Sequence, residues 1–210
     1  MITKNDRQEA ILLDLLPRAF YDRDTVLVAR ELLGKHLVRV LEGGTQLVGR
    51  ITETEAYVGR MDKACHAYNY KRTARTETLF APPGTAYIYL IYGMYHCLNF
   101  VTEPEGEPCA VLIRGIQAVK NGDIIAENRF GRKMDEMSAY QRKNFLNGPG
   151  KVCKGLKLTR EQNGLDLTAP SGGLYVCDGP APSSIQIGKR IGIDYAEEAV
   201  DFPWRFWTED

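Results

Sequence analysis

The pattern of apolar and polar positions along the chain predicts several short helices. In residues 25–33, apolar side chains recur at helical spacing directly after Asp24, a residue type that caps helix N-termini. The segment 122–145 also has helical character, with an interruption at Gly131. Helices are therefore expected over residues 11–16, 25–33 and 122–145, and over 151–156 after the chain-breaking Gly148-Pro149-Gly150.

Period-two alternation and β-branched residues predict strands in the remaining apolar segments. Residues 42–45, Glu-Gly-Gly-Thr, are typical of a hairpin connection, and a second hairpin rich in tyrosine is expected around Gly93. Strands are expected over residues 36–41, 46–58, 109–116, 174–177 and 184–193, with a hairpin over 86–98 and a basic, aromatic loop over 59–79. No repeat or linker divides the sequence, so a single α+β domain spanning residues 1–210 is predicted.

Composition is that of a globular protein. Of the 210 residues, 44% are hydrophobic and 26% are charged, and no apolar run of about 18 residues predicts a membrane span. The N-terminus lacks the apolar core of a signal peptide, which favours a cytoplasmic protein. The five cysteines are an odd, irregularly spaced set, typical of reduced thiols. Cys65-His66 and His96-Cys97 lack zinc-site spacing, so no metal is predicted.

Charge is unevenly distributed, although the formal net charge is zero. Between residues 60 and 160, 16 Lys and Arg residues stand against 9 Asp and Glu residues. A basic face that meets phosphates would produce this surplus on a neutral protein. A scatter of solvated basic side chains would produce it equally well, so charge alone leaves both interpretations open.

The strand 46–58 carries candidate acid–base residues. Alternation places Glu53, Glu55 and Tyr57 on one face. Mutual repulsion of the two carboxylates tends to raise the pKa of one, and such a carboxylate can act as a general base toward water. The ordinary alternative is a solvated edge strand. Arg114 ends an apolar strand and therefore needs a carboxylate or phosphate partner.

Tyrosines are concentrated in the hairpin 86–98. Tyr87, Tyr89, Tyr92 and Tyr95 lead up to and follow the turn at Gly93. Packing in a core is the usual role of tyrosine in a strand, but core partners run out near a protruding tip. Flat aromatic rings there favour stacking on nucleic-acid bases or wedging between them.

Two long strings resemble the alkyladenine (3-methyladenine, methylpurine) DNA glycosylases. They are Glu53-Thr54-Glu55-Ala56-Tyr57-Val58-Gly59 with Asp62 and Cys65-His66, and Pro83-Gly84-Thr85-Ala86-Tyr87-Ile88-Tyr89-Leu90-Ile91-Tyr92-Gly93-Met94-Tyr95 with Cys97-Leu98-Asn99. Shorter similar segments are residues 111–115, 147–153, 190–193 and 203–206, so the resemblance covers nearly the whole chain in order. It implies a mixed α+β domain with a curved antiparallel sheet, surrounding helices and a protruding hairpin, without metal or organic cofactor.

The resemblance implies a monofunctional glycosylase that hydrolyses the bond between an alkylated or deaminated purine and deoxyribose, leaving an abasic site. Glu55 would activate the attacking water and Arg114 would help to hold that water. A carboxylate at this position also stabilises the positive charge that develops on the sugar. The expected partner is double-stranded DNA containing damaged purines, met at the nucleoid of a bacterial-type cytoplasm, with no membrane or obligate protein partner.

The same resemblance assigns the base pocket. Tyr57, His66 and Tyr89 would stack on the extruded base, and Asn99 would help to exclude the amino group of normal guanine. Tyr92 would fill the gap that the flipped nucleotide leaves in the duplex. Electron-rich rings suit alkylated purines, because many of these are cationic.

These roles depend on the register of the hairpin. A two-residue turn at Gly93-Met94 would pair Tyr89 with Leu98 and put Asn99 on the opposite face. We therefore predict an odd-length loop or a bulge. Residues 67–70, Ala-Tyr-Asn-Tyr, depart from the small residues frequent in the family, and the two tyrosines, Tyr68 and Tyr70, are expected to narrow the pocket mouth or touch DNA.

Two other functional classes stay open. A non-catalytic nucleic-acid binder would keep the tyrosine hairpin without turnover, and formation of abasic sites would separate it from an enzyme. An acyl- or formyl-transfer enzyme, or its accessory domain, shares part of this fold and would bind a folate-like ligand instead of DNA.

Overall fold

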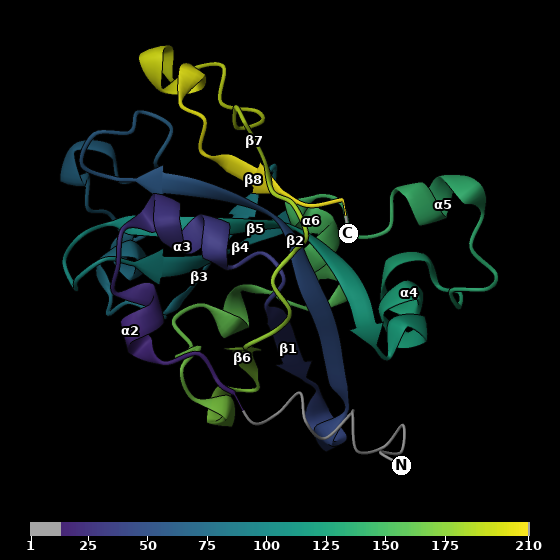
Figure 1. The fold of residues 1–210 in the computed structure, drawn as a ribbon. Helices are drawn as coiled ribbons and strands as arrows, with labels where there is room; N and C mark the ends of the chain where they lie inside the picture. The colour runs from purple at the N-terminus through teal and green to yellow at the C-terminus, as the bar shows by residue number, and fades with distance from the viewer. Residues whose placement is uncertain (1–13, 210) are drawn as a thin grey trace.

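An antiparallel sheet is the frame of the computed structural model, which describes residues 14–209 (Figure 1). Its strands are β1 (His36–Val40), β2 (Gln46–Val58), β3 (Ala86–Ile91), β4 (Tyr95–Thr102), β5 (Cys109–Lys120), β6 (Leu174–Cys177), β7 (Gln186–Gly188) and β8 (Arg205–Trp207). They follow the order β3-β4-β5-β2-β1-β6, while β8 pairs with β2 and β7 pairs with β8. This curled sheet with a few helices confirms the predicted α+β fold.

Within residues 14–209, five short α-helices surround the sheet. They are α2 (Arg18–Tyr21), α3 (Thr25–Glu31), α4 (Gly122–Phe130), α5 (Ala139–Lys143) and α6 (Pro149–Gly155). Asp24 caps α3 as predicted, because its carboxylate accepts a hydrogen bond from the Leu27 amide at 2.9 Å. Val28 and Leu32 are fully buried in the main core, and burial of such a side chain stabilises the fold by about 1.5–3 kcal/mol.

The long strands β2 and β5 are paired with an irregular register. The pairing shifts between Glu53 and Thr54, so that Arg114 is an extra residue of β5. Ile113 and Ile116, three positions apart, consequently both enter the core. On β2, Thr54 turns toward α3, where its hydroxyl donates to the Ala29 carbonyl oxygen at 2.7 Å. A β-bulge re-aims side chains in this way next to functional sites.

The β3–β4 hairpin has a three-residue loop. Ile91 pairs with Tyr95, so residues 92–94 form the loop, and the predicted odd length is confirmed. Tyr87 consequently lies opposite Asn99, and Tyr89 lies opposite Cys97. Directly opposed residues of an antiparallel pair share a face of the sheet, so this register brings the tyrosines and Asn99 to one side.

Three predicted elements differ from the structure. The segment 122–145 forms two helices, α4 and α5, because Gly131 ends α4 in a left-handed conformation with φ 69°. Helix α6 begins at Pro149 instead of residue 151, since proline fits the first helical position. Only Gln186–Gly188 of the predicted strand 184–193 is a strand; beyond it the Arg190 side chain enters a buried ion pair and Gly192 has a φ of 76°.

The predicted helix over residues 11–16 can be compared with the structure only from residue 14 onward. Residues 11–13 of the predicted helix 11–16 lie outside the described residues. The remainder is not helical, because Leu15 forms an antiparallel bridge with Cys177 and the Leu16 amide donates to the Val176 carbonyl oxygen at 2.9 Å.

Candidate active site

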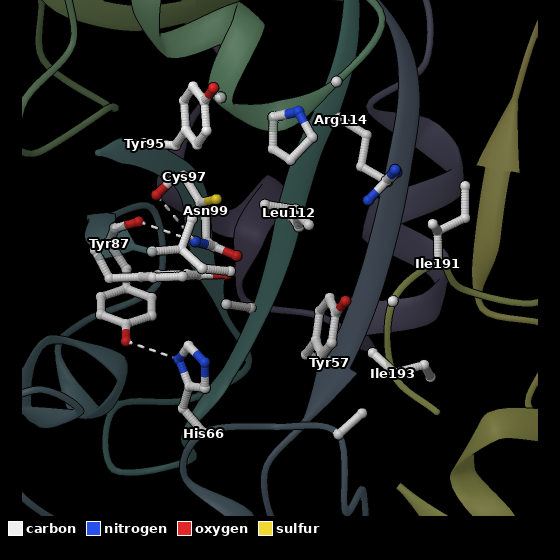
Figure 2. Close-up of a pocket in the computed structure, with 18 of the residues that line it drawn as sticks. Tyr57, His66, Tyr87, Tyr95, Cys97, Asn99, Leu112, Arg114, Ile191 and Ile193 are labelled. Atoms are coloured by element: carbon white, nitrogen blue, oxygen red, sulfur yellow. Dashed lines mark hydrogen bonds between the residues drawn. The ribbon is translucent and has the colours of Figure 1, made fainter. Parts of the chain in front are cut away.

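A cavity of about 530 Å³ opens between the β3–β4 hairpin and the segment that follows β7 (Figure 2). It is lined by residues of β2 to β5, the loop after β2, the start of α6 and the segment 191–195. Five residues predicted from the sequence line it together: Tyr57, His66, Tyr89, Asn99 and Arg114. Tyr92 lines its rim, whereas Glu55 lies behind the wall and not on it.

Aromatic side chains form two sides of the cavity. Figure 2 shows Tyr57 on the β2 side, with Tyr87 and His66 on the hairpin and loop side. The His66 and Tyr89 rings meet edge to face with centroids 4.6 Å apart, and the Tyr87 and Tyr89 centroids are 5.4 Å apart. Leu112 also lines the space between the two sides. A flat, electron-poor ligand would therefore find aromatic faces on both sides.

His66 is held as a neutral imidazole. Its Nε2 lies 3.4 Å from an Arg75 guanidinium nitrogen, which can only donate, so Nδ1 carries the proton and donates to the Tyr87 hydroxyl at 3.2 Å. Burial, followed by the Arg75 charge, lowers the His66 pKa to about 4. At neutral pH the ring therefore adds no positive charge to the cavity.

Glu55 is completely buried, and donors from three elements engage its carboxylate. One oxygen accepts from the Ile191 amide at 2.8 Å and lies 3.4 Å from Arg114 Nε. The other accepts from the Tyr57 hydroxyl at 2.8 Å. Burial raises the Glu55 pKa, opposed first by the Arg114 charge. Repulsion by Glu53, the cause predicted from the sequence, also raises it but is the smallest of the causes.

Arg114 connects the two glutamates. Its Nε donates to Glu53 at 3.1 Å, and the same Glu53 oxygen accepts from Arg205 Nε at 2.6 Å. The partner of Arg114 in the free protein is therefore a carboxylate, one of the two that the sequence allowed. The side chain also lines the cavity, so a single guanidinium touches both the buried Glu55 and the space in front of it.

Asn99 has a fixed orientation at the inner end of the hairpin. Its amide nitrogen donates to the carbonyl oxygens of Tyr87 at 3.2 Å and Cys97 at 3.4 Å, and only 5% of the residue is exposed. Figure 2 shows these bonds beside the cavity. Since the two donor positions are occupied by main-chain acceptors, the amide oxygen is the group left for a ligand.

The hairpin tip projects into solvent. Tyr92, the first residue of the loop 92–94, is 81% exposed and has a left-handed φ of 52°. Met94 and Tyr95 beside it are also exposed. Tyr68 and Tyr70, expected to narrow the mouth or touch DNA, are not among the residues that line the cavity, and the Tyr70 hydroxyl donates to Glu107 at 2.9 Å. Their contact with DNA stays a prediction.

Two cations stand on the rim beside the hairpin. Arg129 and Lys151 line the cavity, and within residues 14–209 neither forms an ion pair with a carboxylate. Lys151 Nζ is oriented by the side-chain oxygens of Asn144 at 3.1 Å and Asn147 at 2.8 Å. Burial lowers the pKa of both cations. An anion bound here would meet two positive charges that no carboxylate neutralises.

The sequence did not predict that residues 191–195 would line one side of the cavity. This segment is attached to the loop after β2 by a buried ion pair between Asp62 and Arg190. Both residues belong to segments on which the resemblance rests, but they are 128 positions apart, and no local pattern pairs them.

Three further findings concern possible metal ligands, the cysteines and the apolar character of the helices. No group of three or more His, Cys, Asp or Glu side chains placed to hold a metal ion occurs within residues 14–209. Each of the five cysteines is a free, buried thiol, and burial raises the pKa of Cys65 to about 12. Among the described helices, none combines the length and apolar character that a membrane crossing needs.

Comparison with known proteins places this site in context. A family described as "Methylpurine-DNA glycosylase (MPG)" matches residues 19–210. The chain is 52% identical over 198 residues to a protein of Clostridium perfringens (strain SM101 / Type A) named "Putative 3-methyladenine DNA glycosylase", covering 93% of this chain and 96% of the relative. Proteins of the same name from Alkaliphilus oremlandii (strain OhILAs) and Clostridium novyi (strain NT) are 47% and 46% identical, over 93% of this chain and 96% and 95% of theirs.

Proposed function

This chain belongs to the methylpurine-DNA glycosylase family, hydrolases that act on damaged DNA, and we propose that it flips alkylated and deaminated purines out of duplex DNA and hydrolyses their N-glycosidic bonds. The observation that carries the proposal is the placement of Glu55 and Arg114. A buried carboxylate, with a cation that reaches both the carboxylate and the cavity, lies directly behind a cavity with aromatic sides.

Base recognition is proposed to depend on the aromatic sides of the cavity. Tyr57 stacks on one face of the extruded base, and His66 and Tyr89 contact the other. Cation–π attraction between a positively charged alkylpurine and such rings contributes about 0.5–2 kcal/mol. The low pKa of His66, about 4, supports this assignment, because a neutral imidazole does not repel a cationic base. The fixed Asn99 amide would discriminate against the guanine amino group.

Glu55 is proposed to act as the general base. The attacking water is proposed to reach the buried carboxylate between Arg114 and Ile191, which both contact Glu55 and both line the cavity. Glu55 accepts a proton from this water as the water oxygen attacks C1′ of the sugar. The negative charge also stabilises the oxocarbenium character that develops as the purine leaves.

Duplex binding is proposed to use the exposed rim. Tyr92 at the hairpin tip fills the gap left by the flipped nucleotide, which offsets part of the few kcal/mol that unstacking and unpairing cost. Arg129 and Lys151 lie beside the tip as partners for backbone phosphates. The Lys151 amine is engaged by two asparagine oxygens, which supports a role in orientation and a monofunctional reaction without an imine intermediate.

The test is release of free base from alkylated duplex DNA by the purified protein, with Glu55→Gln beside it. We expect the wild type to release 3-methyladenine and leave alkali-labile abasic sites. The variant should lose about 100- to 10,000-fold in rate while still binding DNA, because it lacks the base. Glu42→Gln, in the exposed turn between β1 and β2, is the matched control and should retain full activity.

Three outcomes would decide against parts of this proposal. Failure of the wild type to release base from DNA containing alkylated purines, hypoxanthine or ethenoadenine would leave a non-catalytic DNA binder. Full activity of Glu55→Gln would remove Glu55 from the reaction. Trapping of a covalent DNA adduct by borohydride, lost in Lys151→Ala, would contradict a monofunctional mechanism.

A further inference from the structure

Among the ion pairs of residues 14–209, the one between Asp62 and Arg190 is the most deeply buried. Both side chains are fully inaccessible to solvent. The contact is bidentate: Arg190 Nη1 lies 2.5 Å from one Asp62 oxygen and Nη2 lies 2.8 Å from the other. A planar guanidinium held at two points has a defined orientation, which a single contact does not provide.

Arg190 also contacts β2, the C-terminal segment and the Tyr57 ring, which lines the cavity. Its guanidinium donates to the carbonyl oxygens of Ala56 on β2 at 2.8 Å and Ala199 near the C-terminus at 3.1 Å. Its carbon centre lies 4.7 Å from the centroid of the Tyr57 ring, over its face, and 5.2 Å from that of Trp204. The position of the Tyr57 ring, one face of the base pocket, is therefore tied to this cation.

Asp62 connects the pair to the loop that carries His66. Its carboxylate accepts from the main-chain amides of Val58 at 3.3 Å and Ala64 at 3.0 Å. The end of β2, the turn that follows it and the C-terminal segment consequently converge on one carboxylate and one guanidinium. Both terminal nitrogens of Arg190 have acceptors, whereas its Nε is buried without a hydrogen-bond partner.

Ile191, the next residue along the chain, contacts Glu55, the proposed general base. The Ile191 amide donates to Glu55 at 2.8 Å, and residues 191–193 line the cavity. Since the Arg190 side chain anchors this backbone to Asp62 and Ala56, the direction of the Ile191 N–H depends on the pair. Gly192, with a φ of 76°, then turns the chain along the cavity.

We propose that the Asp62–Arg190 ion pair has a positioning role: it aligns the Ile191 amide with Glu55 and holds the Tyr57 ring against the extruded purine base. Stability alone does not account for it, because replacement of buried ion pairs by apolar residues is often neutral or stabilising. What an apolar pair cannot supply is the directional set of hydrogen bonds that fixes residues 190–191. The proposal deepens the proposed function and rests on the role of Glu55 in it.

Several ionisable groups surround Glu55 and affect a titration of its carboxyl group. They are Glu53 and Tyr57 on β2, Cys97 on β4, Arg114 on β5 and Arg190 after β7. Of these, only Arg190 would change its contacts directly in a variant of Asp62. Loss of the Ile191 hydrogen bond would disfavour the charged carboxylate, so the Glu55 pKa would rise.

The first experiment follows the Glu55 carboxyl directly. Protein labelled with ¹³C at glutamate carboxyls is titrated as wild type, Asp62→Asn and Arg190→Lys, with Glu55→Gln to assign the signal. We expect the Glu55 midpoint to move upward in both pair variants. We also expect kcat to fall about 10- to 100-fold with a smaller change in KM, because misplacement of a catalytic group by about 1 Å has effects of this size.

The matched control is Glu103→Gln, which breaks a second ion pair of the same loop. Arg60 Nη1 lies 2.6 Å from Glu103, but neither residue contacts Glu55 or residues 190–193 in the structure. This variant should lose stability without moving the Glu55 midpoint. A folded Asp62→Asn protein with the wild-type Glu55 midpoint and wild-type kcat would overturn the proposal.

A measurement on the wild type covers the case in which neither pair variant folds. The Ile191 amide should be protected from hydrogen exchange, and its ¹⁵N and proton shifts should titrate with Glu55. Exchange as fast as in an exposed loop would overturn the proposal. If the midpoint moves in Asp62→Asn while Glu55→Gln keeps full activity, the positioning role stands and the role of Glu55 as base fails.

Discussion

Two sides of the cavity, the hairpin side (β3 and β4) and the C-terminal side (residues 191–195), are held in place by different means. The hairpin side is local: the register of β3 and β4 alone brings Tyr87 opposite Asn99, 12 positions along the chain. The C-terminal side is non-local, because residues 191–193 are held in place through Asp62 and Arg190, 128 positions apart. The first presents rings and an amide to a ligand, and the second delivers a hydrogen bond to Glu55.

This difference suggests that the hairpin side mainly binds the purine base and that the C-terminal side mainly supports the chemical step. Stacking surfaces tolerate small shifts, since a ring attracts a base over its whole face, whereas a hydrogen bond to a carboxylate weakens steeply with misalignment. Changes on the hairpin side should therefore weaken binding of the base. Changes at the Glu55 network, where the C-terminal side meets β2 and β5, should slow the chemical step.

Among variants that keep Glu55, the largest effect is expected from Arg114→Met. Glu53 and Glu55 would then face each other without the guanidinium that contacts both, so the Glu55 pKa should rise further and kcat should fall about 100- to 1000-fold. Single-turnover base release at saturating enzyme measures the change. Arg205→Met is the control, because Arg205 donates to Glu53 and packs over the Trp207 ring but forms no ion pair with Glu55 among the described residues. Equal losses in the two variants would contradict the account.

A smaller effect, in binding, is expected from Tyr89→Leu on the hairpin side. Loss of one stacking ring removes about 1–3 kcal/mol, which raises the dissociation constant for lesion-containing DNA about 5- to 150-fold. The rate of base release at saturation should stay near that of the wild type. Fluorescence titration with a flipped ethenoadenine separates the two quantities. A variant that binds normally but releases base slowly would reverse the proposed division.

The smallest effect is expected from Tyr57→Phe, which keeps the ring and removes the hydroxyl that donates to Glu55 at 2.8 Å. Base affinity should not change, and the rate should fall about 10-fold as the ionised carboxylate loses one donor. The loss should diminish as the pH is raised, because the Glu55 pKa moves upward. A weaker complex with an unchanged rate would show that the hydroxyl acts on the base instead.

The same two sides differ in how far the sequence predicted them. Alternation in β2 and β3 placed the tyrosines, and the family roles of Tyr89 and Asn99 required the odd loop that the structure has. On the C-terminal side the sequence predicted a strand over 184–193, because apolar residues alternate there. Arg190 instead turns into the buried ion pair, a tertiary interaction that overrides strand propensity.

The electrostatics of Glu55 were only half predicted. Neighbouring carboxylates in sequence suggested repulsion, whereas complete burial is the main cause of its raised pKa. Burial depends on Tyr57, Arg114 and Ile191 together, and these come from three separate segments. A periodic pattern reports which face a residue lies on, but it does not report what covers that face.

The most direct test of the central claim is the pH dependence of single-turnover base release from duplex DNA with one alkylated purine. Burial raises the pKa of Glu55 above that of an ordinary glutamate, so the carboxylate is ionised above this raised pKa and protonated as the pH falls through it. We expect the rate to fall on the acid side with one midpoint above that of an ordinary glutamate, and this limb to be absent from the residual activity of Glu55→Gln. An acid limb that persists unchanged in Glu55→Gln would contradict it.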